Sequence, residues 1–513
     1  MDELFYEHEI IPNLYTIKRY AVSKIDLIRE SLNYLVPEAW LLLGLLIVLV
    51  LDMFSSTRHN SYFAFATLSI FAILSFYLLT QLTGRSNFPD IHFMNEMLQQ
   101  TPAILFSKLL LVISGSIATL FIQFSPSSKW LRKQGEAYIL LLAIILGSFL
   151  LVSSIDLFMV FLSLELISVP SYILVVSRAD KKSVESGIKY LLYGAFASGV
   201  MLFGISLIYG LTGGMDIFSP RWIQVFATVP VFSKWIVFGL VLAALFFKTS
   251  LFPFHPWTPD TYQGAGWAIV NILSTIPKIA AFIFLMKLST VFHGLQTYTL
   301  LLSAVIGLSL IVGNLSALMQ DNTRRLMAYS SIAQGGFIGM AIIGGGDLSH
   351  LSLFFYLIIY MLSVPAALFI LDYFENMTKG DAVNNFNGLG KQEPAMSLIF
   401  VIVMATLIGL PPTAGFFAKL FVFTAVWQQY ETIHSPILLG VIGAAVAGTV
   451  ASVFYYLKVP YSLFFKEFEN TRILTSKYKS SLVFVTLIML PVVGLFFMPD
   501  RLMNLLRLIV LSI

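Results

Sequence analysis

Long apolar runs separated by short polar segments dominate the chain from about residue 38 onward. A helix needs about 20 residues to cross the roughly 30 Å core of a bilayer, so the pattern predicts about fourteen transmembrane helices. The expected ranges are 38–54, 61–83, 102–124, 136–153, 155–177, 183–211, 233–252, 267–286, 298–319, 326–345, 351–374, 394–427, 436–464 and 480–498. The predicted fold class is an all-α integral membrane protein embedded in a lipid bilayer.

Two of these runs are interrupted by proline. Pro411 and Pro412 lie inside the run 394–427, and Pro253 follows the run 233–252. Proline removes a backbone donor and clashes with the preceding turn, so both helices should be broken. Broken segments in two halves of a chain favour inverted repeats around a site near the middle of the membrane. Each break has a phenylalanine pair and a lysine beside it: Phe246, Phe247 and Lys248 at the first, Phe416, Phe417 and Lys419 at the second.

Composition supports the membrane class and narrows the chemistry. The chain is 58% hydrophobic and 11% charged, whereas soluble domains hold roughly 25% charged residues. It has no cysteine, which excludes disulfides and cysteine-ligated iron–sulfur clusters in this chain. Its histidines show no metal-site spacing, and no phosphate loop or dinucleotide motif is present. We expect no cofactor, no metal and no nucleic acid bound to the chain.

Loop charges predict the orientation in the membrane. Lysine and arginine concentrate in the loops that follow odd-numbered helices, as at Arg178 and Arg324. The positive-inside rule places these loops in the cytoplasm and both termini on the outer side. Lys18 and Arg19 in the N-terminal tail oppose this assignment, and the larger set of loop charges decides it. The first 36 residues lack the apolar core of a cleavable signal peptide, and residues 10–36 are expected to form an amphipathic helix on the outer surface.

Four charged side chains lie in the middle of apolar runs: Glu165, Lys248, Lys278 and Lys419. A charge at the centre of a membrane helix costs about 2.5–3.5 kcal/mol on insertion scales. Such groups line ion paths, relay protons or pair to hold a bundle together. We therefore treat these four as candidate site residues. Lys189, about one and a half turns into its run, is a fifth.

Each candidate also has a purely structural interpretation. Glu165 could be a protonated, inert carboxyl, or it could form a static ion pair with Lys248 that only fixes packing. Lys419 could be tolerated because a broken helix is buried at unusual angles. Lys189 could extend its amine to the membrane surface. The same extension to the surface is expected of two lysines near the ends of runs, Lys108 and Lys458.

Hydroxyl and amide side chains interrupt the apolar helices around these charges. Such groups can position water between charged sites, or they can bond neighbouring helices together, which is worth about 0.6 kcal/mol on average. The sequence leaves both interpretations open. The set includes Asn271, Ser274, Thr275, Ser330, Ser331 and Gln334.

Four segments carry a specific resemblance to a known family. The chain resembles the subunit N family, the antiporter-like membrane subunits of bacterial NADH:quinone oxidoreductase (respiratory complex I), over roughly residues 37–500. The matching segments are ESGIKY at 185–190, PFHPWTPDTYQGA at 253–265, RRLMAYSSIA at 324–333 and GLPPTAGF at 409–416.

The resemblance implies a fold of fourteen helices, with helices 4–8 and 9–13 as inverted repeats and helices 7 and 12 broken. The first repeat would cover 136–290 and the second 291–465. An N-terminal extension (1–36) and helices 1–3 (37–135) would precede them, and a C-terminal helix (466–513) would follow.

The resemblance also implies roles for the buried charges. Glu165 and Lys248 match the family's glutamate–lysine pair, Lys278 its connecting lysine, and Lys419 the lysine on the second broken helix. Lys189 matches a further lysine in the sixth helix. The implied function is proton translocation within an NADH:quinone oxidoreductase: protons enter from the cytoplasm, pass laterally through Lys278 and leave on the outer side. The chain would be a translocase subunit without redox chemistry of its own.

Partners and location follow from the same resemblance. FMN, iron–sulfur clusters and quinone are expected in partner subunits. A second antiporter-like subunit and a small neighbouring subunit are expected beside this chain in the bacterial inner (plasma) membrane. An Mrp-type cation/proton antiporter subunit and a static membrane scaffold remain the alternatives.

Two departures from the family pattern bear on the path. Relatives commonly have a Pro-Thr-rich stretch where this chain has GWAIVN at 266–271. Many relatives have histidine where this chain has Gln334. Glutamine bonds water but does not carry a proton, so a proton that must stop there needs a different carrier.

Overall fold

The computed structural model describes residues 31–54, 61–84, 91–129, 131, 135–292, 295–467 and 479–510. This part of the chain is almost entirely helical. Its one sheet is an antiparallel hairpin of β1 (Ile91–Phe93) and β2 (Leu98–Gln100). The helix expected over residues 10–36 lies, up to residue 30, outside the described residues.

Twelve described helices are long and apolar enough to cross a membrane. They match the predicted runs to within a few residues, which confirms the membrane class. Their bounds are α2 (Val36–Phe54), α3 (Ser61–Gly84), α4 (Pro102–Phe124), α5 (Gly135–Ser153), α6 (Leu157–Val176), α7 (Lys181–Thr212), α12 (Trp267–Phe292), α13 (Gln296–Leu318), α14 (Thr323–Ile343), α15 (Gly346–Thr378), α19 (Pro436–Phe465) and α20 (Lys479–Phe497).

The two remaining predicted spans are broken, as expected. The first consists of α9 (Val231–Val241) and α10 (Ala243–Thr249), which meet at Leu242 at an angle of 42°, a bend that no proline marks and that the sequence pattern did not predict. α10 ends just before Pro253, where the break was expected, and the chain becomes helical again in α11 (Trp257–Gly264). The second consists of α17 (Pro394–Ile408) and α18 (Ala414–Ile433).

Short elements complete the described fold. The amphipathic helix α21 (Pro499–Val510) lies against α15 and α4 and buries Met503, Leu506 and Val510. The others are α8 (Pro220–Thr228), α16 (Leu389–Gln392) and the 3-10 turns η1 (Ser127–Lys129) and η3 (Val383–Phe386).

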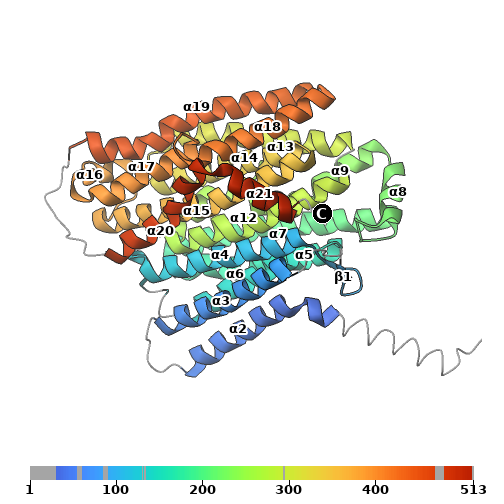
Figure 1. Cartoon of the computed structure of the whole chain (residues 1–513), viewed down its shortest axis with the longest axis horizontal. Helices are drawn as coiled ribbons and strands as arrows, with labels where there is room; N and C mark the ends of the chain where they lie inside the picture. Colours follow the sequence, from blue (N-terminus) through green and yellow to red (C-terminus); the bar gives the residue numbers. More distant parts are fainter. Residues whose placement is uncertain are drawn as a thin grey trace, which may run out of the picture.

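The long helices lie side by side, and α12 lies in the middle of the bundle. Figure 1 shows α2 and α3 along one edge, α19 along the opposite edge and α12 between them. The most apolar window of α12 is 100% buried within the chain, and that of α15 is 89% buried. Polar side chains of α12 therefore face other helices and not lipid. The centre of the bundle is where a polar path can be insulated from the hydrocarbon.

Capping residues fix where helices α7 and α14 begin at one end of the bundle. The Asp180 carboxylate accepts a hydrogen bond of 2.8 Å from the backbone N–H of Ser183 at the start of α7. This bond lowers the pKa of Asp180 below its ordinary value. Asn322 caps α14 in the same way through the N–H groups of Arg324 and Arg325. Such caps satisfy orphan backbone donors at helix starts.

Lys108 does not extend to the membrane surface, so that expectation was wrong. Its amine lies 2.7 Å from the Glu38 carboxylate, and the two side chains are 0% and 5% exposed. The partner lies on α2, seventy residues earlier in the chain than Lys108 on α4, which is why the run containing Lys108 gave no sign of it. Lys458 does reach the end of its helix, where it bonds Asp321 at 2.5 Å.

Replacing only one member of the Glu38–Lys108 pair should destabilise the chain more than replacing both members. Glu38→Gln leaves the Lys108 ammonium buried without a counter-charge, which costs about 3–5 kcal/mol for a buried pair. The double variant Glu38→Leu/Lys108→Met replaces both charges by apolar groups, and we expect it to recover at least the original stability. The thermal unfolding midpoint in detergent measures this. A double variant no more stable than Glu38→Gln would contradict the expectation.

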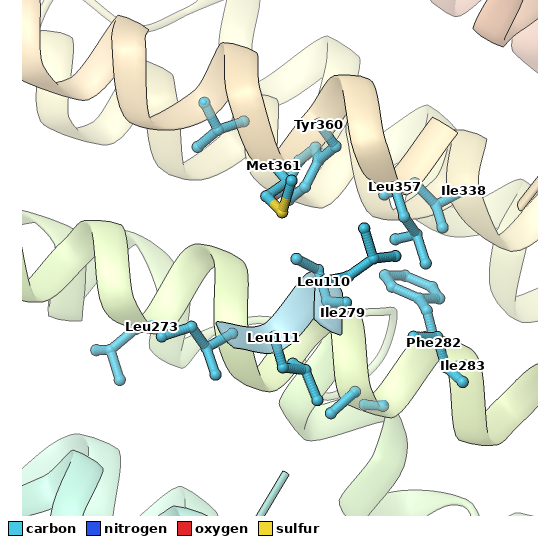
Figure 2. Close-up of a cluster of buried hydrophobic side chains, with 14 of the residues drawn as sticks. Leu110, Leu111, Leu273, Ile279, Phe282, Ile283, Ile338, Leu357, Tyr360 and Met361 are labelled. Atoms are coloured by element: carbon cyan, nitrogen blue, oxygen red, sulfur yellow. The ribbon is translucent and has the colours of Figure 1, made fainter. Parts of the chain in front are cut away.

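An apolar layer fills the centre of the bundle on one side of Lys278. Figure 2 shows Ile279, Phe282 and Ile283 of α12 beside Leu110 of α4 and Leu357 of α15. All five side chains are buried. Along α12 this layer begins directly after Lys278, in the direction away from Trp267. Polar groups therefore approach Lys278 along α12 only from the Trp267 end.

Candidate functional site

Lys248 lies in the last turn of α10, where the first broken helix ends. Its side chain is buried, and its amine donates a hydrogen bond of 3.4 Å to the Tyr190 hydroxyl. The rings of Tyr172, Tyr190 and Phe247 lie 5.5–5.6 Å from the amine nitrogen. Aromatic faces at this distance attract a cation without fixing it in one place. Lys248 is thus enclosed by rings and lacks a tight ion pair.

Glu165 faces this lysine without touching it. The carboxylate acts electrostatically on Lys248, yet no ion pair within 4.0 Å joins the two. Glu165 Oε1 is buried and has no hydrogen-bond partner among the described residues. A carboxylate and an amine that interact at a distance can change their separation, whereas a tight static pair cannot. This geometry is that of a charge pair with room to move.

Lys278 is bonded to a cluster of neutral groups at the middle of α12. Its amine donates to the Ser331 hydroxyl at 2.6 Å and to the Ser331 carbonyl at 3.3 Å. The Tyr262 hydroxyl donates to the same Ser331 hydroxyl at 3.0 Å. The Tyr360 hydroxyl lies 3.3 Å from it and donates to the Ser274 carbonyl. The cluster joins α11, α12, α14 and α15 and holds no described counter-charge for the lysine.

Several buried hydroxyls between Lys248 and Lys278 in the sequence have no hydrogen-bond partner among the described residues. Ser250, Thr258 and Thr261 each have a side-chain oxygen without a partner among the described residues. They lie at and just after the break between α10 and α11. Buried polar groups in proteins are nearly always satisfied, by protein atoms or by ordered water. These hydroxyls mark positions that water would complete.

Lys419 lies at the second break and bonds to main chain. Its amine donates at 2.7 Å to the Ile408 carbonyl, the last residue of α17. Carbonyls in the last turn of a helix have no partner within that helix, and a cation there also suits the helix dipole. The amine lies 4.0 Å from the centre of the Phe337 ring. The Lys419 side chain on α18 therefore bonds across the break to the last residue of α17.

Gln334 connects the second break to the central cluster. Its amide donates to the Leu407 carbonyl at 2.9 Å and accepts from the Tyr356 hydroxyl at 2.6 Å. A cavity of about 10 Å³ beside it is also lined by Tyr360 and Ala418, and about that much space holds one water molecule. Tyr360 belongs to the Lys278 cluster, and Ala418 precedes Lys419. One water there would link the two lysines through neutral groups.

Lys189 lies at the edge of this arrangement. It forms ion pairs with Glu185 at 3.0 Å and Asp260 at 3.2 Å, and its side chain is 43% exposed. These groups line an open pocket of about 180 Å³ at the end of the bundle. The next residue, Tyr190, is the one that bonds Lys248. The structure thus places Lys189 at the mouth of the buried series, while the other four candidates lie inside it.

Tyrosines carry most of the contacts that the sequence did not single out. Tyr190 and Tyr262 each bond a group named above, and so do Tyr356, Tyr360 and Tyr456. Tyrosine in membrane helices ordinarily gathers at the two interfaces. A tyrosine in the middle of an apolar run, such as Tyr356 or Tyr360, is the signal that could have found them. Within the described residues no group of three His, Asp or Glu side chains could hold a metal ion.

Comparisons with known proteins agree with this geometry. Residues 154–446 match the family "NADH:quinone oxidoreductase/Mrp antiporter, TM". "NADH-quinone oxidoreductase subunit N 2" of Chloroherpeton thalassium is 33% identical, over 93% of this chain and 94% of the relative. "NADH-quinone oxidoreductase subunit N" of Cytophaga hutchinsonii is 37% identical, over 75% of this chain and 82% of the relative.

Solved structures show the same fold. A chain of respiratory complex I from Thermus thermophilus with bound aureothin superposes with a TM-score of 0.74 at 27% identity, over 91% of this chain and 98% of that one. A chain of the Mrp complex from Dietzia sp. has a TM-score of 0.77, but at 19% identity over 92% and 96% of the two chains it shows the fold alone. The chain therefore belongs to the subunit N family of NADH-quinone oxidoreductase membrane subunits.

Proposed function

We propose that this chain moves protons across the membrane as the subunit N of an NADH:quinone oxidoreductase, driven by electron transfer in partner subunits. The observation that carries the proposal is the series Glu165, Lys248, Lys278 and Lys419, which runs through the middle of the bundle. Buried ionisable groups in membrane proteins mark ion paths and proton relays. The neutral hydroxyls and amides between them can hold water, so the series is continuous enough for protons.

Each charge in the series has a role that its surroundings support. Glu165 and Lys248 interact without contact, so a charge change beside Glu165 alters how firmly Lys248 holds its proton. Lys278 has only neutral partners and can pass a proton on without breaking an ion pair. Lys419 is bonded to a carbonyl at the second break and would receive the proton last. Gln334 lies between them as a hydrogen-bonding bridge and not as a carrier.

Partner subunits supply what this chain lacks. FMN, iron–sulfur clusters and quinone belong to the partners in this proposal, which makes the chain one part of a translocase. The outer face of α6 indicates where one partner docks: Phe158, Leu162, Val169 and Ile173 are exposed along it, and Glu165 lies in the same stripe. Glu165 is half-buried, with Oε1 inside the bundle, and a carboxylate that borders hydrocarbon is costly, so we infer that a small membrane subunit covers this stripe. A second antiporter-like subunit would lie elsewhere on the bundle.

Orientation follows from the basic end of the bundle. Arg178, Arg324 and Lys379 meet at one end, where loops after odd-numbered helices gather. The positive-inside rule places that end in the cytoplasm and the hairpin of β1 and β2 on the outer side of the bacterial inner membrane.

Replacing both members of the charge pair tests the proposal against a static scaffold. In Glu165→Gln/Lys248→Met no buried charge is left uncompensated, so the complex should assemble. We expect its NADH-driven, uncoupler-sensitive proton pumping in inside-out vesicles to fall to background. Lys234→Met is the matched control, because Lys234 lies in the same broken helix but bonds only the Ala227 carbonyl.

The scaffold interpretation makes the opposite prediction. A pair that only fixes packing can be replaced by neutral side chains without loss of pumping. Normal pumping by the assembled double variant would therefore remove Glu165 and Lys248 from the proton path and overturn the proposal.

A further inference from the structure

A cavity of about 270 Å³ opens at the basic end of the bundle, apart from the pocket at Lys189. Its walls come from α14, α15 and the turn η1, from the loop before α7 and from Gly266 just before α12. They carry both signs of charge, and the main lining residues are Arg178, Gly266, Arg324, Asp372, Glu375 and Lys379. The series from Glu165 to Lys419 uses none of these residues.

Asp372 is the buried carboxyl of this cavity. It lies near the end of α15, is 1% exposed, and accepts a hydrogen bond from the Ser125 hydroxyl through Oδ2. Ser127, which also lines the cavity, is a second hydrogen-bonding neighbour of this carboxyl, although Oδ1 has no partner at hydrogen-bond geometry among the described residues. Arg324 acts on it electrostatically but bonds Glu375 instead. Asp372 is thus a carboxyl in a polar cavity with one oxygen left open.

Asn271 is a second unsatisfied group, on the way from the cavity to Lys278. It is fully buried, and neither its amide nitrogen nor its amide oxygen has a partner among the described residues. Trp267, one turn earlier on α12, donates to Glu375 of the cavity wall at 2.6 Å. Lys278 lies two turns later on the same face. An unsatisfied amide in a helix that lipid does not reach calls for water.

Two side-chain arrangements show how near the cavity comes to Lys278. Arg324 lines the cavity and Ser331 bonds Lys278, and these residues are two turns apart on one face of α14, about 10 Å along its axis. Tyr262 joins the same two points, because its carbonyl accepts from Arg324 and its hydroxyl donates to Ser331.

We propose that Lys278 takes up protons directly from the basic end through a second route, in which Asp372 receives the proton in the cavity and water at Asn271 carries it to the Lys278 cluster. The carboxylate gains a proton from bulk water and returns it to the water chain, and the neutral Lys278 amine accepts it. The inference rests on the proposed proton-pumping function. It brings protons to the central lysine, while the Glu165–Lys248 pair is still required to drive their onward transfer.

The residues that follow Lys278 on α12 favour proton uptake from the basic end over uptake from the opposite end. After Lys278 the next residues of α12, which include Ile279, Phe282 and Ile283 (Figure 2), are apolar and buried up to Met286, whereas before it Asn271, Ser274 and Thr275 interrupt the apolar residues. Water that reaches Asn271 can therefore meet Lys278 from the basic end without opening a continuous leak.

Silver-ion accessibility tests the route without reference to pumping. The chain has no cysteine, so Asn271→Cys provides its only thiol, and Ag⁺ is close in size to a hydrated proton. In the assembled complex, Ag⁺ added at the basic end should protect Asn271→Cys from later maleimide labelling after denaturation. Ile272→Cys, equally buried on the next position of α12, should remain unprotected. Equal behaviour of the two thiols would overturn the route.

Proton pumping by two further variants tests whether protons take this route. Asn271→Leu removes an unsatisfied amide and keeps its shape, so the complex should be at least as stable. We expect several-fold lower pumping in Asn271→Leu and in Asp372→Asn, and normal pumping in Asp321→Asn, which changes a carboxylate at the same end that bonds Lys458.

The two proposals fail separately. Normal pumping in both Asn271→Leu and Asp372→Asn, with pumping lost in Glu165→Gln/Lys248→Met, would reject this route and leave the proposed function standing. Normal pumping in the charge-pair variant would reject the function, whatever the silver result.

Discussion

Lys278→Met is expected to abolish proton pumping while the complex still assembles and still oxidises its electron donor at a measurable rate. Lys278 is the one basic side chain among the described residues of its cluster, and every proposed path passes through it. Its partners are the Ser331 hydroxyl and carbonyl and not a carboxylate, so methionine leaves no buried counter-charge behind. Uncoupler-sensitive acidification of inside-out vesicles, normalised to the amount of assembled complex, measures the loss.

Lys287→Met is the control for this variant. Lys287 lies nine residues later on the same helix and bonds the Ser154 carbonyl at the end of the bundle, so its loss should leave pumping unchanged. Lys278→Arg adds a second comparison, because arginine keeps the charge but does not release a proton. Pumping in Lys278→Met at the level of Lys287→Met would show that protons bypass the central cluster.

Arg324→Leu is expected to prevent stable assembly. The guanidinium makes a two-point contact with the Glu375 carboxylate at 2.9 and 3.0 Å and donates to the Ala265 carbonyl at 2.7 Å. It also lies 4.5 Å from the Trp267 ring. Removing one member of a buried pair costs about 3–5 kcal/mol, a large part of the stability of most domains. Thermal unfolding and the yield of assembled complex measure the effect.

Geometry as well as charge should matter at Arg324. A lysine there keeps the positive charge but cannot reproduce the forked contact, so Arg324→Lys should recover little stability. Arg325→Leu is the matched control: its side chain is 32% exposed and its nearest carboxylate lies 3.6 Å away. Arg324→Lys with full stability would mean that charge alone is needed and that the forked geometry is not.

The membrane helices were predictable because their signal is local. A run of apolar residues and a proline determine where a membrane helix lies and where it breaks, and the breaks at Pro253 and Pro411 fall as expected. The buried lysines Lys248, Lys278 and Lys419 were also visible as charges in apolar runs. All of these inferences need only residues within one helix, so no knowledge of the tertiary arrangement is involved.

What the sequence could not supply is which helices meet. Lys108 was expected to reach the membrane surface because its partner, Glu38, belongs to a different helix. Asp372 was not predicted as a site residue because it lies near the end of its apolar run, where a charged residue is not unusual. The departure at Gln334 was evident, but its bonds to Tyr356 and to the end of α17 depend on three helices meeting. The polar cluster around Lys278 is likewise a property of the packed bundle.

The outward stripe of α6 has a consequence for how the complex is built. Glu165 is half-buried among exposed apolar side chains, so without the proposed neighbour its carboxylate borders lipid and is costly to ionise. Docking removes that cost and thereby adds a driving force for joining the two subunits. An orphan chain is left with an unshielded acid in the bilayer, the kind of defect that membrane quality control can detect. The residue proposed for proton transfer would then also serve as a checkpoint in biogenesis.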